Sequence, residues 1–312
     1  MHRLSRRSCL AALATLAVAA QPRSWATGKL SVVATFTILA DMVRNVGGER
    51  FALTTLVGPD ADAHVYEPTP ADAGALAQTD LVVVNGLGFE GWIDRLIKAS
   101  GYQGPVVVAS QGIAALQAKE DQPDPHVWQD LANGRLAVAN IARALAAADP
   151  AHADRYRRRA EAYGRELAAL DRDIRSRLDA FPRQQRKVVT SHDAFQYFGR
   201  AYGIDFLAPV GLSTESEPSA GEVAALIRRM RAEGIHALFV ENAADPRLVE
   251  QLAREAGVVI GGRLYSDSLS GPAGPAPTYL DMFRHNVGEI ANAFTNEPRS
   301  APQSGLAGNP RR

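Results

Sequence analysis

Short β-branched runs alternate with helical stretches along the chain, and this alternation limits the possible folds more than any other feature of the sequence. Runs such as LVVVN, PVVVA and ALFVE are apolar throughout, as expected of strands buried on both faces. Strand, helix and strand in regular order predict parallel sheets covered by helices, an α/β fold. The expected strands form two groups of four, which predicts two similar lobes: Leu30–Phe36, Ala52–Val57, Leu81–Asn85 and Pro105–Ala109, then Lys187–Thr190, Ile204–Pro209, His236–Glu241 and Val258–Leu264.

An uninterrupted helical pattern separates the two groups. Asp149-Pro150 is a favourable start for a helix, because a carboxylate that can cap the helix is followed by proline in the first turn. A helix of about 30 residues is about 45 Å long, enough to join both lobes as a stiff strut. We therefore expect an N-terminal lobe at 27–148, a connecting helix at 149–181 and a C-terminal lobe at 182–296. Apolar residues recur in steps of three and four along one face of this helix, at Tyr156, Ala160, Tyr163, Leu167, Leu170, Ile174, Leu178 and Phe181.

The N-terminus has the layout of a secretory signal peptide at 1–26. Arginines precede an apolar run at Cys9–Ala20, and the small residues Ser24 and Ala26 suit cleavage after Ala26. The run is too short for a membrane anchor, although a buried N-terminal helix is the alternative. We expect export to the periplasm, with the pair at 6–7 a weak indication of the twin-arginine route. The segment 297–312, rich in Pro, Ser and Gly, predicts a disordered tail.

The mature chain is mildly acidic and has no thiol. The single cysteine, Cys9, lies in the expected signal peptide, so a metal site must use His, Asp or Glu. Removal of 1–26 lowers Lys+Arg from 34 to 30 against 34 Asp+Glu, a net charge of about −4. A chain of this charge without a basic run is not expected to bind nucleic acid.

Three of the seven histidines follow predicted strands. His64 follows ALTTLV, His126 follows PVVVA and a long loop, and His192 follows KVVT directly. Asp267 comes after VVIGGRL in the same way. Ligands of parallel α/β sheets gather at the carboxyl ends of the strands, so the shared placement of these four residues predicts one site. The other histidines, His2, His152, His236 and His285, are expected in the signal peptide, on the surface or in ordinary packing.

Several segments resemble the cluster A-I solute-binding proteins (ZnuA/TroA-like), the zinc- and manganese-binding receptors of bacterial ABC importers. The resemblance runs from about Leu30 to about Phe294 and keeps the order of the family's segments. It is carried by HVYEPTPAD (His64–Asp72), DPHVW (Asp124–Trp128), VTSHDAFQYFGRAYG (Val189–Gly203), STESEPS (Ser213–Ser219), FVENAADPRLVEQLAREAG (Phe239–Gly257) and LYSDSLS (Leu264–Ser270).

The resemblance implies two α/β lobes joined by one long rigid helix, with a metal site in the interlobe cleft. It assigns the ligand roles to His64, His126, His192 and Asp267. Some members have Glu where this chain has His192, and many zinc-specific members carry a long His-rich loop where this chain has the short QAKEDQPD. The implied function is capture of a divalent metal and delivery to the membrane permease of an ABC importer. A periplasmic metallochaperone stays open as a second partner, and a monomer is expected.

The donor types favour zinc, with manganese as the alternative. Three neutral imidazoles and one carboxylate suit four-coordinate zinc at about 2.0–2.2 Å. Manganese favours more oxygen donors, which a bidentate Asp267 supplies in part. Glu241, Glu215 and Glu217 are candidates for orienting a ligand imidazole, or else for helix caps and solvent-facing positions. Trp128, next to His126, is expected either to pack around the site or to belong to the core or a hinge.

Two other classes of protein compete with this interpretation. A secreted metallohydrolase would keep an open zinc position for water, whereas four protein ligands close the site. The sequence contains no HExxH, GxSxG or Walker motif, so we expect no enzyme. A receptor for a small organic solute would need a roomy pocket with an aromatic and polar lining.

Overall fold

The computed structural model describes residues 29–118, 122–215 and 217–295. The expected signal peptide at 1–26 and the expected tail at 297–312 lie outside the described residues, as does part of the QAKEDQPD loop. Within the described ranges, no helix is both long and apolar enough to cross a bilayer.

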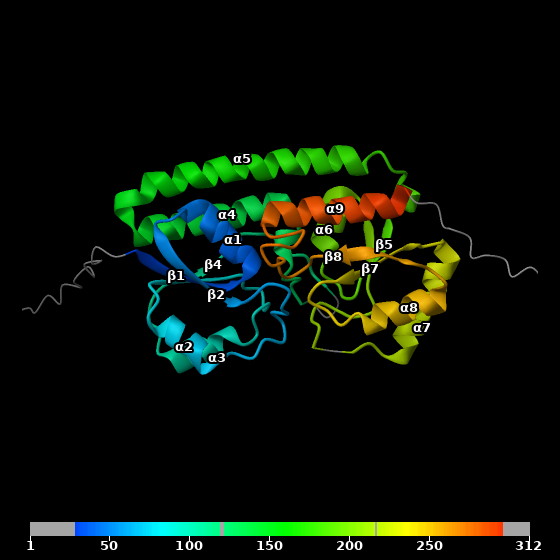
Figure 1. Ribbon diagram of the computed structural model, residues 1–312, viewed down its shortest axis with the longest axis horizontal. Helices are drawn as coiled ribbons and strands as arrows, with labels where there is room; N and C mark the ends of the chain where they lie inside the picture. The colour runs from blue at the N-terminus through cyan, green and yellow to red at the C-terminus, as the bar shows by residue number, and fades with distance from the viewer. Residues whose placement is uncertain (1–28, 119–121, 216, 296–312) are drawn as a thin grey trace, which may run out of the picture.

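Two parallel four-stranded sheets form the centres of two lobes in the described chain (Figure 1). The strand order is β2-β1-β3-β4 in the N lobe and β6-β5-β7-β8 in the C lobe, so the two sheets have the same topology. This confirms the fold class predicted from the sequence. The strands are β1 (Leu30–Phe36), β2 (Phe51–Val57), β3 (Leu81–Val84), β4 (Val106–Val108), β5 (Lys187–Val189), β6 (Asp205–Leu207), β7 (Ala237–Glu241) and β8 (Ile260–Leu264).

Helices lie on both sides of each sheet. In the view of Figure 1, α2 and α3 lie below the N-lobe sheet, α7 and α8 lie below the C-lobe sheet, and α1, α4, α5 and α9 lie above. The helices are α1 (Thr37–Gly47), α2 (Pro70–Ala77), α3 (Ile93–Ser100), α4 (Leu131–Ala148), α5 (Ala153–Leu178), α6 (Gln196–Tyr202), α7 (Ala220–Glu233), α8 (Arg247–Ala256) and α9 (Tyr279–Thr295). Short 3-10 turns occur at Val127–Gln129, Pro150–His152 and Arg183–Gln185.

The long helix α5 joins the lobes, as predicted, but it is shorter than 149–181. Its 26 residues span about 39 Å, and it packs on α1 and α4 of the N lobe and on α6 and α9 of the C lobe. The chain enters through the 3-10 turn at Pro150–His152. Asp149 therefore does not cap the backbone but binds the side chains of His152 and Tyr156. At the other end Pro182 disfavours helical geometry at Phe181, and the helix stops at Leu178.

One hydrophobic core extends through both lobes. It contains the buried apolar face of α5, residues of the N-lobe sheet such as Val33 and Val83, and the residues Val188 and Phe239 on one face of the C-lobe sheet. A second core cluster, under α7 and α8, contains the alternating neighbours of these strand residues, such as Val189 and Leu238. The central C-lobe strands β5 and β7 are therefore buried on both faces, which explains apolar runs such as ALFV in β7.

Hydrogen bonds also connect the lobes near the carboxyl ends of the strands. The Thr37 hydroxyl accepts from Leu269 N at 2.8 Å, and Asp60 N donates to Leu269 O at 3.1 Å. The buried carboxylate of Asp41 on α1 accepts from Tyr279 N, at the start of α9, at 3.1 Å. These contacts and the shared core fix the position of one lobe relative to the other.

We expect Leu167→Ala to lower the free energy of unfolding by about 2–5 kcal/mol, since Leu167 is fully buried on α5 and its truncation leaves a cavity. Leu136→Ala is the matched control, because Leu136 on α4 is 49% exposed, and its effect should stay within about 0.5 kcal/mol. Urea denaturation followed by circular dichroism measures both. Because the core is shared, the lobes should unfold in one transition, and two separate transitions would contradict a common core.

Candidate metal centre

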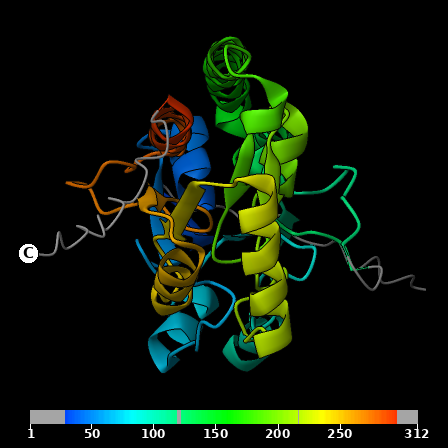
Figure 2. The ribbon, with the colours of Figure 1, turned by 90° about the vertical axis from the view of Figure 1, so that its right-hand side faces the viewer.

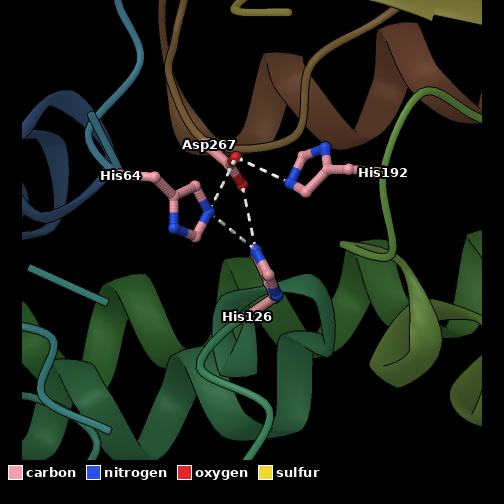
Figure 3. Close-up of side chains that lie close together, drawn as sticks. All are labelled: His64, His126, His192 and Asp267. Carbon is pink, nitrogen blue, oxygen red and sulfur yellow. Dashed lines mark hydrogen bonds and ion pairs between the residues drawn. The ribbon is translucent and has the colours of Figure 1, made fainter. Parts of the chain in front are cut away.

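The four residues predicted from the sequence come together between the lobes (Figure 3). His64 lies in the loop after β2, and His126 ends the long loop after β4, directly before the 3-10 turn that leads into α4. His192 follows β5, and Asp267 follows β8. Each lobe therefore supplies two side chains from the carboxyl ends of its parallel strands.

The spacing of the four side chains fits a single metal ion. One nitrogen or oxygen atom from each lies within 4.8 Å of the others. His64 Nε2 is 3.3 Å from His126 Nε2, and Asp267 oxygens lie 3.5 Å from His64 Nε2, 3.7 Å from His126 Nε2 and 3.0 Å from His192 Nε2. A tetrahedral ion with ligands at about 2.0–2.1 Å needs ligand atoms about 3.3–3.4 Å apart, close to these values.

The centre is buried, and several of its donor atoms have no partner outside the cluster. The exposed fraction is 7% for His64, 0% for His126, and 1% for His192 and Asp267. Within the described chain, both oxygens of Asp267 and Nε2 of His192 have no hydrogen-bond partner outside the four-residue cluster. Burying such groups unpaired is unfavourable, and a cation bound among them would satisfy all of them at once.

The charge of Asp267 is maintained by the surrounding imidazoles. Burial by itself would raise the pKa of this carboxyl, but His192 and His126 outweigh that effect and hold its pKa well below the ordinary value. Asp267 is therefore an anion inside the protein, which is the form that ligates a metal.

Asp124 orients His126. Its Oδ1 accepts a hydrogen bond from His126 N at 2.9 Å and lies 2.8 Å from His126 Nδ1. With the proton of the ring on Nδ1, the lone pair of Nε2 points toward the other ligands. The backbone of this loop is also fixed, because Asn85 Nδ2 donates to Pro125 O at 2.9 Å and the Tyr197 hydroxyl donates to Asp124 O at 2.9 Å.

Glu241 has the corresponding position beside His192. Its Oε1 accepts from His192 N at 2.9 Å, and its Oε2 lies 2.8 Å from His192 Nδ1. Burial would lower the pKa of His192, but the Glu241 and Asp267 carboxylates raise it well above the ordinary value. Of the three glutamates that the sequence suggested, Glu241 is the one found against a ligand imidazole, whereas Glu215 and Glu217 are exposed.

Aromatic rings cover the N-lobe side of the centre. Trp128 packs against His126 with ring centroids 5.4 Å apart, and its Nε1 donates to Ser266 O of the C lobe at 2.8 Å. The indole lies beside the site, belongs to the shared hydrophobic core and also links the lobes. Phe89 packs edge-on against His64 at 4.7 Å and against Trp128 at 4.7 Å.

Sequence reasoning missed Asp124 and Phe89. Asp124 had a signal, because it lies two residues before His126 in DPHVW, close enough in sequence to bind that histidine. Phe89 had none beyond its apolar character. Three of the histidines assigned to other roles lie elsewhere: His152 pairs with Asp149, His285 contacts Arg263 O, and His236 is exposed, whereas His2 lies outside the described residues.

The comparison with known protein families identifies the chain. Residues 32–293 match the family ZnuA, described as "Zinc-uptake complex component A periplasmic". The chain belongs to this family. Its members are metal-binding, substrate-binding proteins of ABC importers, so the chain is a metal-binding protein of that class and not an enzyme. This excludes the metallohydrolase alternative.

Individual relatives of the ZnuA-family chain carry the names of different metals. The iron-binding protein YfeA of Yersinia pestis is 35% identical, with 90% of this chain and 92% of YfeA covered. The manganese-binding lipoprotein MntA of Halalkalibacterium halodurans is 35% identical, with 85% and 89% covered. The solved structure of the periplasmic zinc-binding protein TroA from Treponema pallidum has a TM-score of 0.82 at 32% identity and covers 86% of this chain and 99% of TroA.

We expect His64→Ala, His126→Ala and His192→Ala each to weaken metal binding sharply, since each removes one of four converging donors. His236→Ala and His285→Ala are the controls, because these histidines lie outside the cluster. Isothermal titration of each variant with Zn²⁺ measures the effect. If His236→Ala abolished binding while His126→Ala left it intact, the ligand set would be wrong.

Metal affinity should fall as the pH decreases, because an imidazole must be neutral to ligate and the pKa of an unperturbed histidine is about 6.5. The raised pKa of His192 means that its proton still competes with the metal above that range. We expect the apparent affinity to fall about tenfold per pH unit for each proton displaced. Titrations between pH 5.5 and 8 test this, with Glu241→Gln as a comparison that should move the fall to lower pH. Equal dissociation constants at pH 5.5 and 7.5 would contradict ligation by these histidines.

Proposed function

We propose that the chain captures zinc outside the cytoplasm and delivers it to the membrane permease of an ABC importer. His64, His126, His192 and Asp267 would be the ligands. The observation that carries the proposal is the convergence of these four buried donors, two from each lobe, with one donor atom of each within 4.8 Å of the others. The ion is cargo, so the site would have to bind it outside the cytoplasm and release it again at the permease.

Zinc is favoured by the kind of atoms that converge. Three imidazole nitrogens and one carboxylate are typical of four-coordinate zinc, and Asp124 and Glu241 contact the second nitrogen of two of these rings. Imidazole binds zinc more strongly than manganese, which lies at the weak end of the divalent series. The zinc-binding protein TroA, at 32% identity, is consistent with this preference.

Manganese is the second candidate, and one observation favours it. Both oxygens of Asp267 are without hydrogen-bond partners in the described chain, so the carboxylate could bind through both atoms and raise the coordination number. The name of the relative MntA points the same way. The same proposal includes the permease as the partner, a periplasmic location after export and a monomeric state. A loading metallochaperone remains an option within it.

We expect the mature protein to bind one equivalent of zinc and to melt at a higher temperature with zinc than with chelator. An ion at 1,000 times its dissociation constant would stabilise the fold by about 4 kcal/mol. Calorimetric scans with and without chelator measure the shift, and identical scans would exclude the site.

The choice of metal is tested on the same protein by titrating zinc and manganese under one buffer condition, for the wild type and Asp267→Ala. Zinc should bind more tightly, and Asp267→Ala should weaken manganese more than zinc, since three imidazoles still hold zinc. A preference of the wild type for manganese at equal free concentrations would overturn the zinc assignment.

A further inference from the structure

A cavity of ≈ 830 Å³ lies on the C lobe beside the buried centre. Its walls include residues from the first turns of α7 and α8. In Figure 2, these two helices lie at the end of the C lobe, on the side that faces the viewer. Asp62, from the loop that carries His64, contributes the N-lobe wall. His192 also lines the cavity, so this space reaches one of the four proposed ligands directly.

The charge on the cavity walls is negative. Four carboxylates line it, from Asp62, Glu217, Asp245 and Glu255, against the guanidinium of Arg247. Arg247 Nε binds Asp245 Oδ2 at 2.7 Å, which pairs its charge with one of the four. The remaining acidic groups give the cavity a potential that attracts cations, because a recess lined by one sign of charge concentrates its field.

The inner end of the cavity has polar groups that are uncommitted or shared with the site. Ser191 is 5% exposed, and within the described chain its hydroxyl has no hydrogen-bond partner. Asp62 Oδ1 accepts from His64 N at 2.8 Å, and its Oδ2 accepts from the Thr214 hydroxyl of the C lobe at 2.6 Å. The Asp62–Thr214 hydrogen bond therefore joins the two lobes within the cavity wall, next to a ligand loop.

Aromatic side chains cover the N-lobe side of the centre. His126 has no exposed surface, and Phe89 and Trp128, at 1% and 2% exposure, lie against its N-lobe side. The exposed residue nearest in sequence to a ligand is Val65, which is 48% exposed beside His64 and marks a rival approach.

We infer that this acidic cavity is the route by which the hydrated cation reaches and leaves the buried centre. The inference rests on the proposed function. The carboxylates of Glu217 and Glu255 attract the ion to the cavity, and the ion then passes Ser191 and the Asp62–Thr214 contact to reach His192. A divalent cation is the ligand that suits this cavity, because the walls carry net negative charge. An anion or an acidic peptide would be repelled.

The charge of the route is tested with the double variant Glu217→Gln/Glu255→Gln, which removes two exposed carboxylates without touching a ligand. Stopped-flow mixing with Zn²⁺, followed by protein fluorescence, gives the association rate constant. We expect it to fall by at least about threefold at low salt and the difference to disappear near 1 M salt, where the Debye length is about 3 Å. The control is Glu250→Gln, an exposed carboxylate on α8 that is not among the lining residues.

The path itself is tested by obstruction. Ala224→Trp on α7 places a large side chain in the cavity wall, and Ala225→Trp, the exposed neighbour outside the lining, is its matched control. A blocked route slows association and dissociation together, on the order of tenfold, and leaves the dissociation constant nearly unchanged. Ala224→Leu serves as a milder obstruction if the Trp variant folds poorly. Thr214→Val removes the hydrogen bond between Thr214 and Asp62, which joins the two lobes in the cavity wall. This variant should therefore increase both the association and the dissociation rate constants.

The inference is overturned if Glu217→Gln/Glu255→Gln binds as fast as Glu250→Gln at low salt, or if Ala224→Leu and Ala224→Trp leave both rates unchanged. It is also overturned if Val65→Trp slows both rates and the α7 variants do not, which would place the route beside His64. A wild type that binds no zinc or manganese at equilibrium would instead refute the proposed function, so the two failures are distinguishable.

Discussion

The packing of α1, α4, α5, α6 and α9 into one core that continues from sheet to sheet is the constraint on which the rest of the structure depends. The four proposed ligands come from two lobes, and their donor atoms must meet within a few ångströms. A flexible linker would allow the distance between donor atoms of the two lobes to vary, whereas a helix packed on both lobes fixes that distance. Trp128 and Tyr279 extend this constraint to the site, because the indole of Trp128 donates to Ser266 O of the C lobe and the Tyr279 hydroxyl binds Trp128 O. Interlobe geometry and ligand geometry are therefore set by the same contacts.

The electrostatics of the centre favour a positively charged ligand. A carboxylate buried among three imidazoles remains ionised because neighbouring histidines lower its pKa, and one of these histidines has its own pKa raised in return. Without an ion, protons supply the missing positive charge, and several donor atoms stay unpaired. A divalent metal would replace those protons and satisfy the atoms that have no partner outside the cluster. Asp124 and Glu241 restrict two of the rings to the orientations that direct Nε2 inward, so little has to rearrange when the ion arrives.

Burial that protects the ion also limits how it can arrive and leave. The ligands have almost no exposed surface, and the stiff connection between the lobes leaves little room for a wide opening. A cavity that reaches His192 along α8 and the start of α7 would let the ion pass without separating the lobes. These helices belong to the smaller core under the C-lobe sheet, which is separate from the core that holds the lobes together. Motion there would change access while leaving the shared core intact.

The sequence by itself determined the architecture and which four side chains converge between the lobes. Apolar runs with regular spacing specify buried parallel strands, and residues that follow strands lie at the carboxyl edge of a sheet. The amphipathic pattern at 149–181 specifies the connecting helix, of which α5 covers 26 residues. Local chemistry also accounts for the end of α5 before Pro182. Only the tertiary structure decided which groups surround the ligands. Glu241 contacts His192 across 49 residues, and Phe89 reaches His64 from another loop, because long-range packing and not local sequence brings those segments together. The cavity likewise combines Asp62 of one lobe with α7 and α8 of the other, a juxtaposition that exists only once the shared core has fixed both lobes in place.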